Sequence, residues 1–272
     1  MAETDNCNRS SLCPCGDARV ELTNYFEQGE TDFKYCAECN LLIRWPMPSQ
    51  ADLDEIYRVH YSSENIIDGC TNQETGDYAL RKYLAYLEER YVNSNSRILD
   101  YGAGSGAFVE LMRERGFSCD GYETSVDARQ FSAEVRGIGL FGDLSDVPKD
   151  TYDCITVIEV IEHLTNVWQD LKIVQSLLKP GGLAFITTPN RKGIRAKMEK
   201  GFWKEARKKF HLILFDKKSL KYQLEKANFV NIDFVKYSPI QKAGIRNYIQ
   251  GRMFQLVNMP GTLCVMASKD KH

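Results

Sequence analysis

The sequence predicts an α/β protein built on a doubly wound, mainly parallel sheet, with a small Cys-rich cap at its N-terminus. From residue 97 onward, short apolar runs alternate with helical patterns, which is typical of parallel strands covered by helices on both faces. A glycine-rich turn, GAGSG at residues 102–106, follows the first of these apolar runs. Five of the nine cysteines fall within the first 40 residues, and this clustering predicts the cap.

Composition and charge limit the classes of function. The 272 residues are 43% hydrophobic and 26% charged, and the net charge of −2 lacks the basic excess of a dedicated nucleic-acid binder. No nucleic-acid partner is therefore expected. No apolar run approaches the roughly 20 residues of a membrane span, and the polar start does not resemble a signal peptide. We expect a cytoplasmic protein with reduced cysteines.

Residues 1–48 form the predicted Cys-rich segment. Cys13 and Cys15, then Cys36 and Cys39, make two knuckles that resemble a zinc ribbon, in which four thiolates hold a structural zinc ion. The first knuckle has one intervening residue instead of two. Three interpretations stay open: the loop is distorted, Cys7 replaces one ligand, or the metal has been lost.

Residues 49–95 predict a helical connection. Ser49 is a plausible N-cap ahead of an apolar stripe that includes Leu53 and Ile56. Apolar residues recur at helical spacing between residues 77 and 92, so a second helix should pack against the sheet.

Residues 96–272 predict the α/β domain. Its expected strands are the apolar runs at 97–101, 118–123, 137–141, 152–158 and 183–188. Helical patterns separate them, at 124–136 and 166–182 for example. In such a sheet the ligand binds at the carboxyl ends of the strands, where the glycine-rich turn also lies.

The glycine-rich turn is compatible with either of two classes of ligand. Gly102, Gly104 and Ala107 match the dinucleotide fingerprint, which places a diphosphate at a helix N-terminus. Asp100 argues against that ligand, because a carboxylate beside the turn repels a diphosphate and attracts a cation, and Gly106 departs from the fingerprint. S-adenosylmethionine, with an ammonium, a sulfonium and no phosphate, fits better.

Two further acids follow predicted strands. Glu123 ends the second strand, where its carboxylate can accept hydrogen bonds from both ribose hydroxyls. Asp143 follows the third strand and can accept the adenine amine, while Leu144 offers an apolar face and a backbone amide.

Five motifs in order resemble those of the class I S-adenosylmethionine-dependent methyltransferases: LDYGAGSG, GYETS, GDL, VIEVIEHL and LLKPGGLAFITTPN. The resemblance implies a seven-stranded Rossmann-like sheet. The whole pattern, cysteine knuckles included, is similar to a bacterial branch acting on sugars, quinones and other metabolites, and the core is similar to ubiquinone-biosynthesis O-methyltransferases. The positions expected to bind the cofactor are Asp100, Tyr101, Gly102, Ala103, Gly104, Gly106, Glu123, Thr124, Asp143, Leu144 and Glu159.

The candidate catalytic residues are Glu159, Glu162, His163 and His211. The resemblance to the ubiquinone enzymes associates the first three with a divalent metal such as magnesium, which would lower the pKa of an acceptor hydroxyl. Alternatively, Glu162 and His163 brace the start of the next helix. His163 or His211 would take the acceptor proton, or His211 is a hydrogen-bonded histidine at a strand edge.

Residues 191–215 are expected to form a lid insertion beside the cleft. Its first part, 191–210, holds nine Lys or Arg against two Glu, interleaved with apolar and aromatic residues. This pattern predicts an anionic acceptor or contact with an anionic membrane surface, unless it is an ordinary solvated helix.

Together these features predict a methyltransferase that acts on a hydroxyl of a small metabolite such as a sugar, a nucleotide-sugar or a quinone. Two alternatives stay open: an NAD(P)-binding dehydrogenase, and a non-catalytic methyltransferase-like protein that binds a partner through its cysteines and basic segment. The sequence makes no prediction about the oligomeric state.

Overall fold

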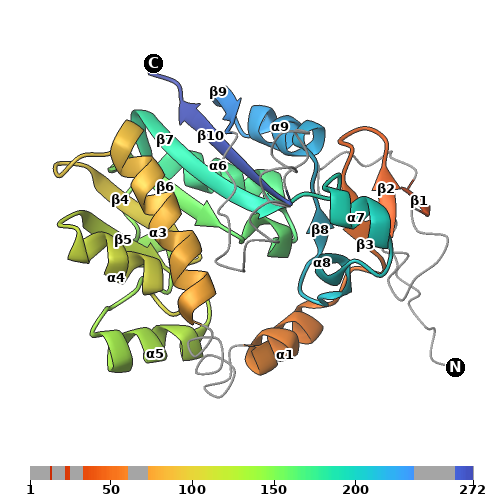
Figure 1. Ribbon diagram of the computed structural model, residues 1–272, viewed down its shortest axis with the longest axis horizontal. Coiled ribbons are helices and arrows are strands. Elements are labelled where there is room, and N and C mark those ends of the chain that lie inside the picture. Colours follow the sequence, from red (N-terminus) through yellow and green to blue (C-terminus); the bar gives the residue numbers. More distant parts are fainter. Residues whose placement is uncertain (1–12, 14–21, 25–32, 61–72, 236–260, 272) are drawn as a thin grey trace, which may run out of the picture.

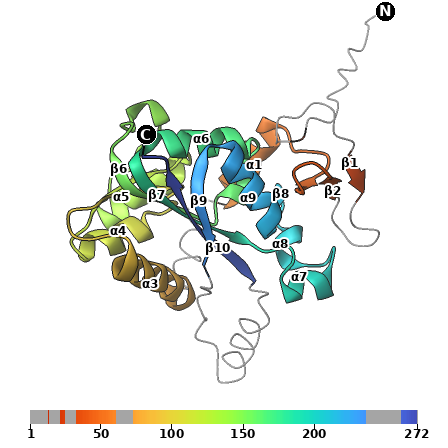
Figure 2. The same ribbon diagram turned by 90° about the horizontal axis from the view of Figure 1, so that it is seen from above.

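Two β-sheets organise the protein, whose structure is a computed structural model that describes residues 13, 22–24, 33–60, 73–235 and 261–271. The large sheet has the strand order β5-β4-β6-β7-β10-β9, and the small sheet has the order β1-β2-β3-β8 (Figure 1). The small sheet stands at one side of the large one, and α7 (Ile194–Glu199) and α8 (Lys204–Arg207) lie next to it (Figure 2).

The large sheet confirms the predicted α/β class. Its strands are β4 (Arg97–Tyr101), β5 (Ser118–Tyr122), β6 (Tyr152–Ile158), β7 (Leu178–Pro189), β9 (Phe229–Phe234) and β10 (Thr262–Lys269). β5, β4, β6 and β7 run parallel, whereas β10 pairs antiparallel with both β7 and β9. The strands carry apolar side chains on both faces, which explains why helices cover both sides.

Each face of the large sheet has its own helices. α3 (Gln73–Arg90) and α4 (Ala107–Glu114) pack on one face, where Leu84 and Val109 belong to the same apolar cluster as Phe185 of β7. α6 (Val167–Leu177) and α9 (Lys217–Lys226) pack on the other face, against a cluster that includes Ile155 and Ile186. These two clusters form the core.

The apolar run at 137–141 does not form the strand that the sequence predicts. α5 (Val126–Arg136) ends at Gly137, which adopts a left-handed φ of 68°, and only Phe141 then makes a parallel bridge, to Tyr122. Glycine has no side chain to pack within a strand, and this run contains two. The large sheet therefore has six strands among the described residues, where seven are expected.

The small sheet combines the Cys-rich segment with the insertion that follows β7. β1 (Leu22–Asn24), β2 (Phe33–Cys36) and β3 (Leu42–Arg44) form an antiparallel series, and β8 (Ile213–Leu214) pairs with β3. The insertion also packs its apolar side chains on this sheet. The buried cluster they share contains Phe33, Leu42, Ala196, Trp203, Ala206 and Leu214.

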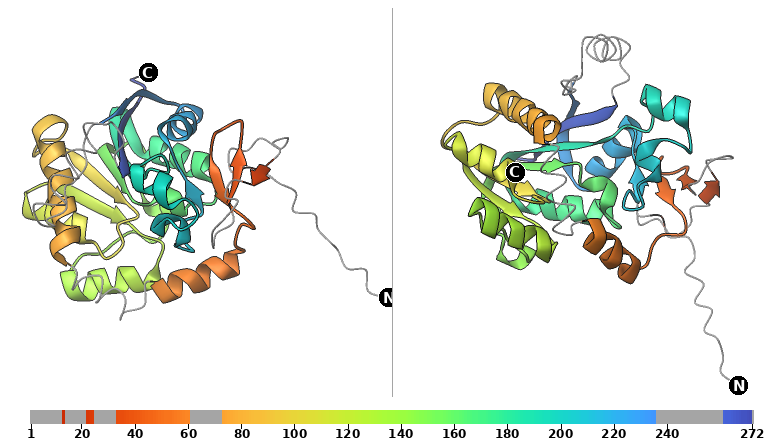
Figure 3. Two further views of the ribbon diagram at one scale, coloured as in Figure 1. Left: turned by 45° about the vertical axis from the view of Figure 1, so that its right-hand side comes forward. Right: turned by 60° about the horizontal axis from the view of Figure 1, so that its bottom comes forward.

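α1 (Gln50–His60) lies beside α5, at the edge where β4 and β5 end (Figure 3). Its predicted N-cap is confirmed: Ser49 Oγ accepts a hydrogen bond from Asp52 N at 3.2 Å, and Asp52 Oδ2 accepts one from Ser49 N at 2.9 Å. This reciprocal cap fixes the direction in which the helix leaves the small sheet.

A buried polar network joins the turn between β2 and β3 to the start of α9. Asp216 is 1% exposed, and its carboxylate accepts hydrogen bonds from both Asn40 Nδ2 (2.7 Å) and Arg191 Nη2 (2.6 Å). Its Oδ1 also accepts from Ser219 N, which completes a capping box on α9. Lys192 Nζ lies 3.0 Å from the same carboxylate.

Asp216→Asn is expected to lower the free energy of unfolding by about 3–5 kcal/mol at pH 7, because it leaves the buried Arg191 guanidinium without its counter-charge. Burial raises the pKa of Asp216, but the Ser219 N–H and the charges of Arg191 and Lys192 outweigh it and hold that pKa below its usual value. The stabilisation is therefore complete above the unfolded pKa of about 3.9 and is lost as pH falls through the folded pKa.

Urea unfolding of wild type and Asp216→Asn at several pH values measures this difference. Asp150→Asn is the matched control, since Asp150 makes an exposed ion pair with Lys269 that should be worth at most about 1 kcal/mol. A difference below 1 kcal/mol at pH 7, or one that grows as the pH falls, would contradict the prediction.

Candidate functional site

The turn after β4 requires glycine. Gly102, Gly104 and Gly106 all have positive φ, at 81°, 52° and 78°. A Cβ on Gly102 would come within 2.5 Å of Val160 Cγ2, and one on Gly106 within 2.4 Å of Ser132 Oγ. The left-handed backbone at all three positions, and the close approach at Gly102 and Gly106, strongly favour glycine, so the chain passes tightly from β4 into α4.

Glu123 holds this turn from the end of the neighbouring strand. It is 5% exposed; its Oε2 accepts a hydrogen bond from Gly104 N at 2.8 Å, and its Oε1 accepts one from Ser125 N at 2.8 Å. Two backbone amides thus orient the carboxylate. Glu123 also lines a cleft beside the turn. Fixing a carboxylate in this way pre-organises it for ligand hydroxyls.

Asp100 lies behind the turn. It is 4% exposed and accepts a hydrogen bond from Thr156 Oγ1 at 2.7 Å, and it is not among the residues that line the cleft. Burial raises its pKa to about 7. In this structure Asp100 joins β4 to β6 from behind the turn, and its contact with a bound cofactor stays a prediction.

The cleft has a volume of about 620 Å³ and lies at the carboxyl ends of β4, β5 and β6, as the fold class predicts. Seven of the residues expected from the sequence line it: Tyr101, Gly102, Glu123, Thr124, Leu144, Glu159 and His163. The other expected residues among those described lie outside its wall: Asp100, Ala103, Gly104, Gly106, Asp143, Glu162 and His211.

Nine lining residues were missed by the sequence analysis, and three of them, Tyr122, Asp170 and Asp54, shape the polar wall of the cleft. Tyr122 ends β5, Asp170 lies on α6, and Asp54 lies on α1. Tyr122 directly precedes Glu123 at a strand end, a position that could have identified it. Asp170 and Asp54 lie within helical patterns whose orientation only the fold reveals.

These residues give the cleft an acidic wall. Tyr101 Oη donates a hydrogen bond to Asp170 Oδ1 at 3.4 Å, and the Tyr101 and Tyr122 rings are 5.0 Å apart. Burial raises the pKa of Asp170 to about 6, so the carboxyl is largely ionised at neutral pH. A wall that contains Asp54, Glu123 and Asp170 favours a cationic ligand and disfavours a diphosphate.

Asp143 has a local role that the sequence did not predict. It caps the short 3-10 helix η1 (Leu144–Asp146) by accepting a hydrogen bond from Ser145 N at 2.8 Å. The cap holds Leu144 at the cleft wall, while Asp143 itself is exposed.

Glu159 has a strained backbone at the end of β6. Its φ of 54° is left-handed, which is uncommon for a residue other than glycine and is concentrated at functional sites. Its Oε1 accepts a hydrogen bond from Thr187 Oγ1 at 3.0 Å, and Thr187 Oγ1 is also 3.2 Å from Glu159 N. Loss of hydration raises the pKa of the carboxyl.

Glu162 and His163 follow on η2 (Ile161–His163). Glu162 is 1% exposed: Oε2 accepts a hydrogen bond from Thr188 Oγ1 at 2.9 Å, whereas Oε1 has no hydrogen-bond partner among the described residues and lies 3.8 Å from His163 Nε2. Burial, and then the charge of Glu159, raise the pKa of Glu162. A cation beside Oε1 would offset that penalty.

His211 completes this cluster from outside the motif. It is 2% exposed, and its ring centroid lies 5.0 Å from that of His163. Ligand atoms of Glu162, His163 and His211 all lie within 4.8 Å of one another and could hold a metal ion. The expected set contained Glu159 in place of His211, so this donor set has two imidazoles and one carboxylate.

The environment of His211 keeps its ring neutral. Burial, and then electrostatic repulsion between the charged ring and His163, Lys208 and Arg44, lower its pKa to about 2. A neutral imidazole is a metal ligand, but one with so low a pKa is a weak proton acceptor. His163, which lines the cleft, is the better placed of the two to receive a proton.

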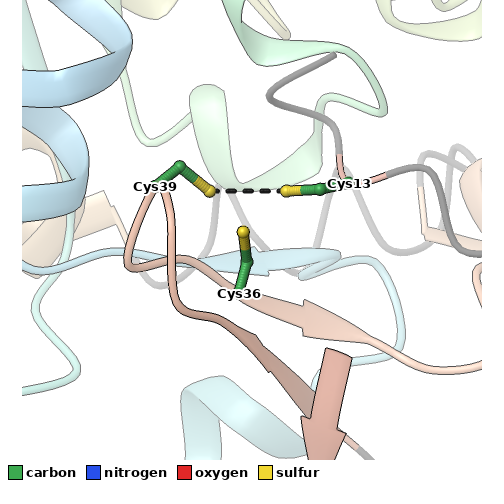
Figure 4. Close-up of side chains that lie close together, drawn as sticks. All are labelled: Cys13, Cys36 and Cys39. Atoms are coloured by element: carbon green, nitrogen blue, oxygen red, sulfur yellow. Dashed lines mark hydrogen bonds between the residues drawn. The ribbon is translucent and has the colours of Figure 1, made fainter. Parts of the chain in front are cut away.

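Three cysteines of the Cys-rich segment converge (Figure 4). Cys13, Cys36 and Cys39 are buried, their sulfurs lie within 4.8 Å of one another, and the Cys13 and Cys39 sulfurs are 3.4 Å apart. Sulfurs around a tetrahedral zinc ion are about 3.8 Å apart, so the three thiols fit a structural zinc site. Cys15 and Cys7, the candidates for a fourth ligand, lie outside the described residues.

Within the described ranges, no helix combines the length and the apolar composition that crossing a bilayer requires.

The chain matches known methyltransferases in sequence. A family described as "Methyltransferase domain" matches residues 73–233, more than half of the chain. A ubiquinone biosynthesis O-methyltransferase of Coxiella burnetii is 29% identical over 116 residues, which are 40% of this chain and 50% of that protein. One from Parvibaculum lavamentivorans is 35% identical over 103 residues, 35% of this chain and 41% of that protein. The chain thus spans about half the length of these relatives, or less.

Solved structures share the fold. A SAM-dependent methyltransferase of Archaeoglobus fulgidus aligns with a TM-score of 0.52 at 19% identity, over 70% of this chain and 91% of that one. Phosphoethanolamine N-methyltransferase 2 of Haemonchus contortus, solved with S-adenosylmethionine, aligns with a TM-score of 0.58 at 14% identity, over 92% of this chain and 71% of that one.

Glu123→Ala is expected to weaken S-adenosylmethionine binding by about 1.5–3 kcal/mol, the value of charge-assisted hydrogen bonds to ligand hydroxyls, or roughly 10- to 150-fold in Kd. Titration calorimetry measures it, and Glu134→Ala on the outer face of α5 is the control. An unchanged Kd would show that Glu123 does not contact the ligand.

Purified protein prepared without chelators is expected to contain about one zinc ion per chain, and Cys36→Ser or Cys39→Ser should lose it, because each removes a thiolate ligand. Metal analysis by mass spectrometry provides the measurement, with Cys264→Ser on β10 as the control thiol. Zinc-free wild-type protein would leave the three cysteines a packing role only.

Proposed function

The chain belongs to the class I S-adenosylmethionine-dependent methyltransferases, and we propose that it transfers a methyl group from S-adenosylmethionine to a hydroxyl of a small metabolite. The single observation that carries this proposal is the acidic cleft beside the glycine turn, with His163 in its wall. The ubiquinone biosynthesis O-methyltransferases that the chain resembles support a hydroxyl acceptor.

The cleft suits the donor. Glu123, already oriented by two backbone amides, would accept hydrogen bonds from the ribose hydroxyls, and Leu144 would pack on the adenine. The carboxylates of the wall favour the ammonium and sulfonium of the donor. NAD carries a diphosphate instead, and this cleft offers it acidic neighbours, which argues against the dehydrogenase alternative.

Catalysis then depends on position and on one proton transfer. The sulfonium is a good leaving group, so the protein has to align the acceptor oxygen with the methyl carbon and exclude water. His163 would take the hydroxyl proton as the oxygen attacks, and Glu162, 3.8 Å from its Nε2, would stabilise the resulting imidazolium.

A divalent metal ion could bind next to the acceptor hydroxyl. Glu162, His163 and His211 would hold it, and the unpartnered Glu162 Oε1 supports this assignment. Such an ion lowers the pKa of a bound hydroxyl. Two imidazoles with one carboxylate suit zinc, manganese or iron better than magnesium, which prefers oxygen ligands.

The insertion favours an anionic acceptor. Exposed cations on residues 191–210 include Lys192, Arg195, Lys200 and Lys204, and the exposed Met198 and Phe202 lie among them. A phosphate-bearing sugar, nucleotide or lipid would complement this surface, and an anionic membrane could present such a lipid.

A screen of hydroxyl-bearing acceptors with radiolabelled S-adenosylmethionine tests the proposed function. Each acceptor is assayed with and without its phosphate group, in parallel with calorimetry of S-adenosylmethionine and NAD binding. Transfer to a hydroxyl, with preference for the phosphorylated form, supports the proposal. Binding of NAD alone would favour a dehydrogenase, and donor binding without any transfer would favour the non-catalytic alternative.

His163→Ala is expected to lower kcat by about 10²- to 10⁴-fold while the Kd for S-adenosylmethionine changes less than twofold, because a general base acts on the acceptor and not on the bound donor. His211→Ala should have a smaller effect unless a metal participates. Assays with chelator and with added metal separate the two routes. Near-normal turnover of both variants would refute both assignments and leave catalysis to positioning.

A further inference from the structure

Arg44 connects the Cys-rich segment to the residues that carry His211. It ends β3, and its backbone N donates a hydrogen bond to Leu212 O at 2.8 Å. Leu212 N in turn donates to Glu162 O at 2.7 Å. The segment at 211–214 is therefore held between the small sheet on one side and η2, with its catalytic candidates, on the other.

The Arg44 side chain makes three further bonds to the same segment. Its Nε donates to His211 O at 3.0 Å, and its Nη2 donates to Ala206 O at 2.6 Å and to Lys208 O at 2.8 Å. The guanidinium carbon also lies 4.8 Å from the centre of the Phe33 ring on β2. A planar group fixed by three carbonyls and a ring has little freedom.

These carbonyls need an outside donor. α8 spans only Lys204–Arg207, so the carbonyls at and after its end lack the amides of a following helical turn. Arg44 supplies the donors from a different segment, and the chain can then turn back at His211 N, which donates to Lys208 O at 3.0 Å. The backbone position of His211 thus depends on a residue 167 positions earlier.

We propose that Arg44 is a positioning residue of the active site: through it, the Cys-rich segment sets the place of His211 beside His163. This inference rests on the proposed function, in which His163 takes the acceptor proton and the His211 ring lies against it. It gives the Cys-rich segment a role in turnover, because a displacement of about 1 Å at a reacting group can cost on the order of 10²-fold in rate.

The test compares Arg44→Ala and Arg44→Lys with Lys34→Ala. Lys34 is the matched control, since it is a cation on β2 of the same sheet. Its ammonium lies 4.0 Å from the centre of the Trp45 ring, whereas the Arg44 guanidinium binds the 206–211 segment. With an acceptor from the screen, Arg44→Ala should lower kcat about 10- to 100-fold with less than a twofold change in the Kd for S-adenosylmethionine. Arg44→Lys should recover part of that loss.

A second measurement needs no acceptor. The chain has four histidines, so the labelled ring signals of His163 and His211 can be assigned by substitution and followed by NMR at one pH. In the wild type the two rings, whose centroids are 5.0 Å apart, should show cross-relaxation, and in Arg44→Ala this signal should weaken because the segment that carries His211 loses its donor. In Lys34→Ala it should stay as in the wild type.

The outcomes are distinct. Equal kcat in Arg44→Ala and wild type, an unchanged cross-relaxation between the His163 and His211 rings, or an equal loss in Lys34→Ala would overturn the inference. If Arg44→Ala does not fold, Arg44→Lys decides by the same two readouts. Absence of methyl transfer by the wild type would refute the proposed function, while the cross-relaxation between the His163 and His211 rings would still test the position that Arg44 imposes.

Discussion

The path of the backbone between β4 and α4 is the constraint on which the rest of the site depends. Three left-handed glycines let the chain turn within five residues, and Glu123 fixes the middle one through its amide. Val160 packs closely against Gly102, and Ser132 packs closely against Gly106. The turn therefore also sets the spacing between β4, the end of β6 and α5. The cleft exists because these three elements meet around one tight turn.

A second constraint links the cleft to the small sheet. Leu212 bonds to Arg44 on one side and to Glu162 on the other, which brings His211 against a motif almost 50 residues earlier in the chain. The Cys-rich segment, the insertion and η2 thereby act as one structural unit. The buried carboxylate of Asp216 adds a polar link within this unit, because it accepts hydrogen bonds from both Asn40 and Arg191.

Local patterns predicted the part of the site that depends on strand ends. Glu123, Tyr101 and Glu159 lie at the carboxyl ends of parallel strands, and alternation of strands and helices was enough to bring them together. Asp170, Asp54 and Arg44 could not be predicted in this way, because their roles follow from which helix face or sheet edge is turned toward the cleft. The hydrogen bond between Asp100 and Thr156 on β6 could not be predicted either, because it depends on the register of two strands that lie far apart in the sequence.

The pairing of β3 with β8 has a consequence for how the chain acquires its shape during synthesis. Ile43 is the register partner of Ile213, so the small sheet lacks its fourth strand until most of the polypeptide has left the ribosome. Until then, Leu42 and Phe33 have no Trp203, Ala206 or Leu214 to cover them. The β2–β3 hairpin is synthesised long before β8, so the nascent chain carries an unpaired β3 edge throughout the interval.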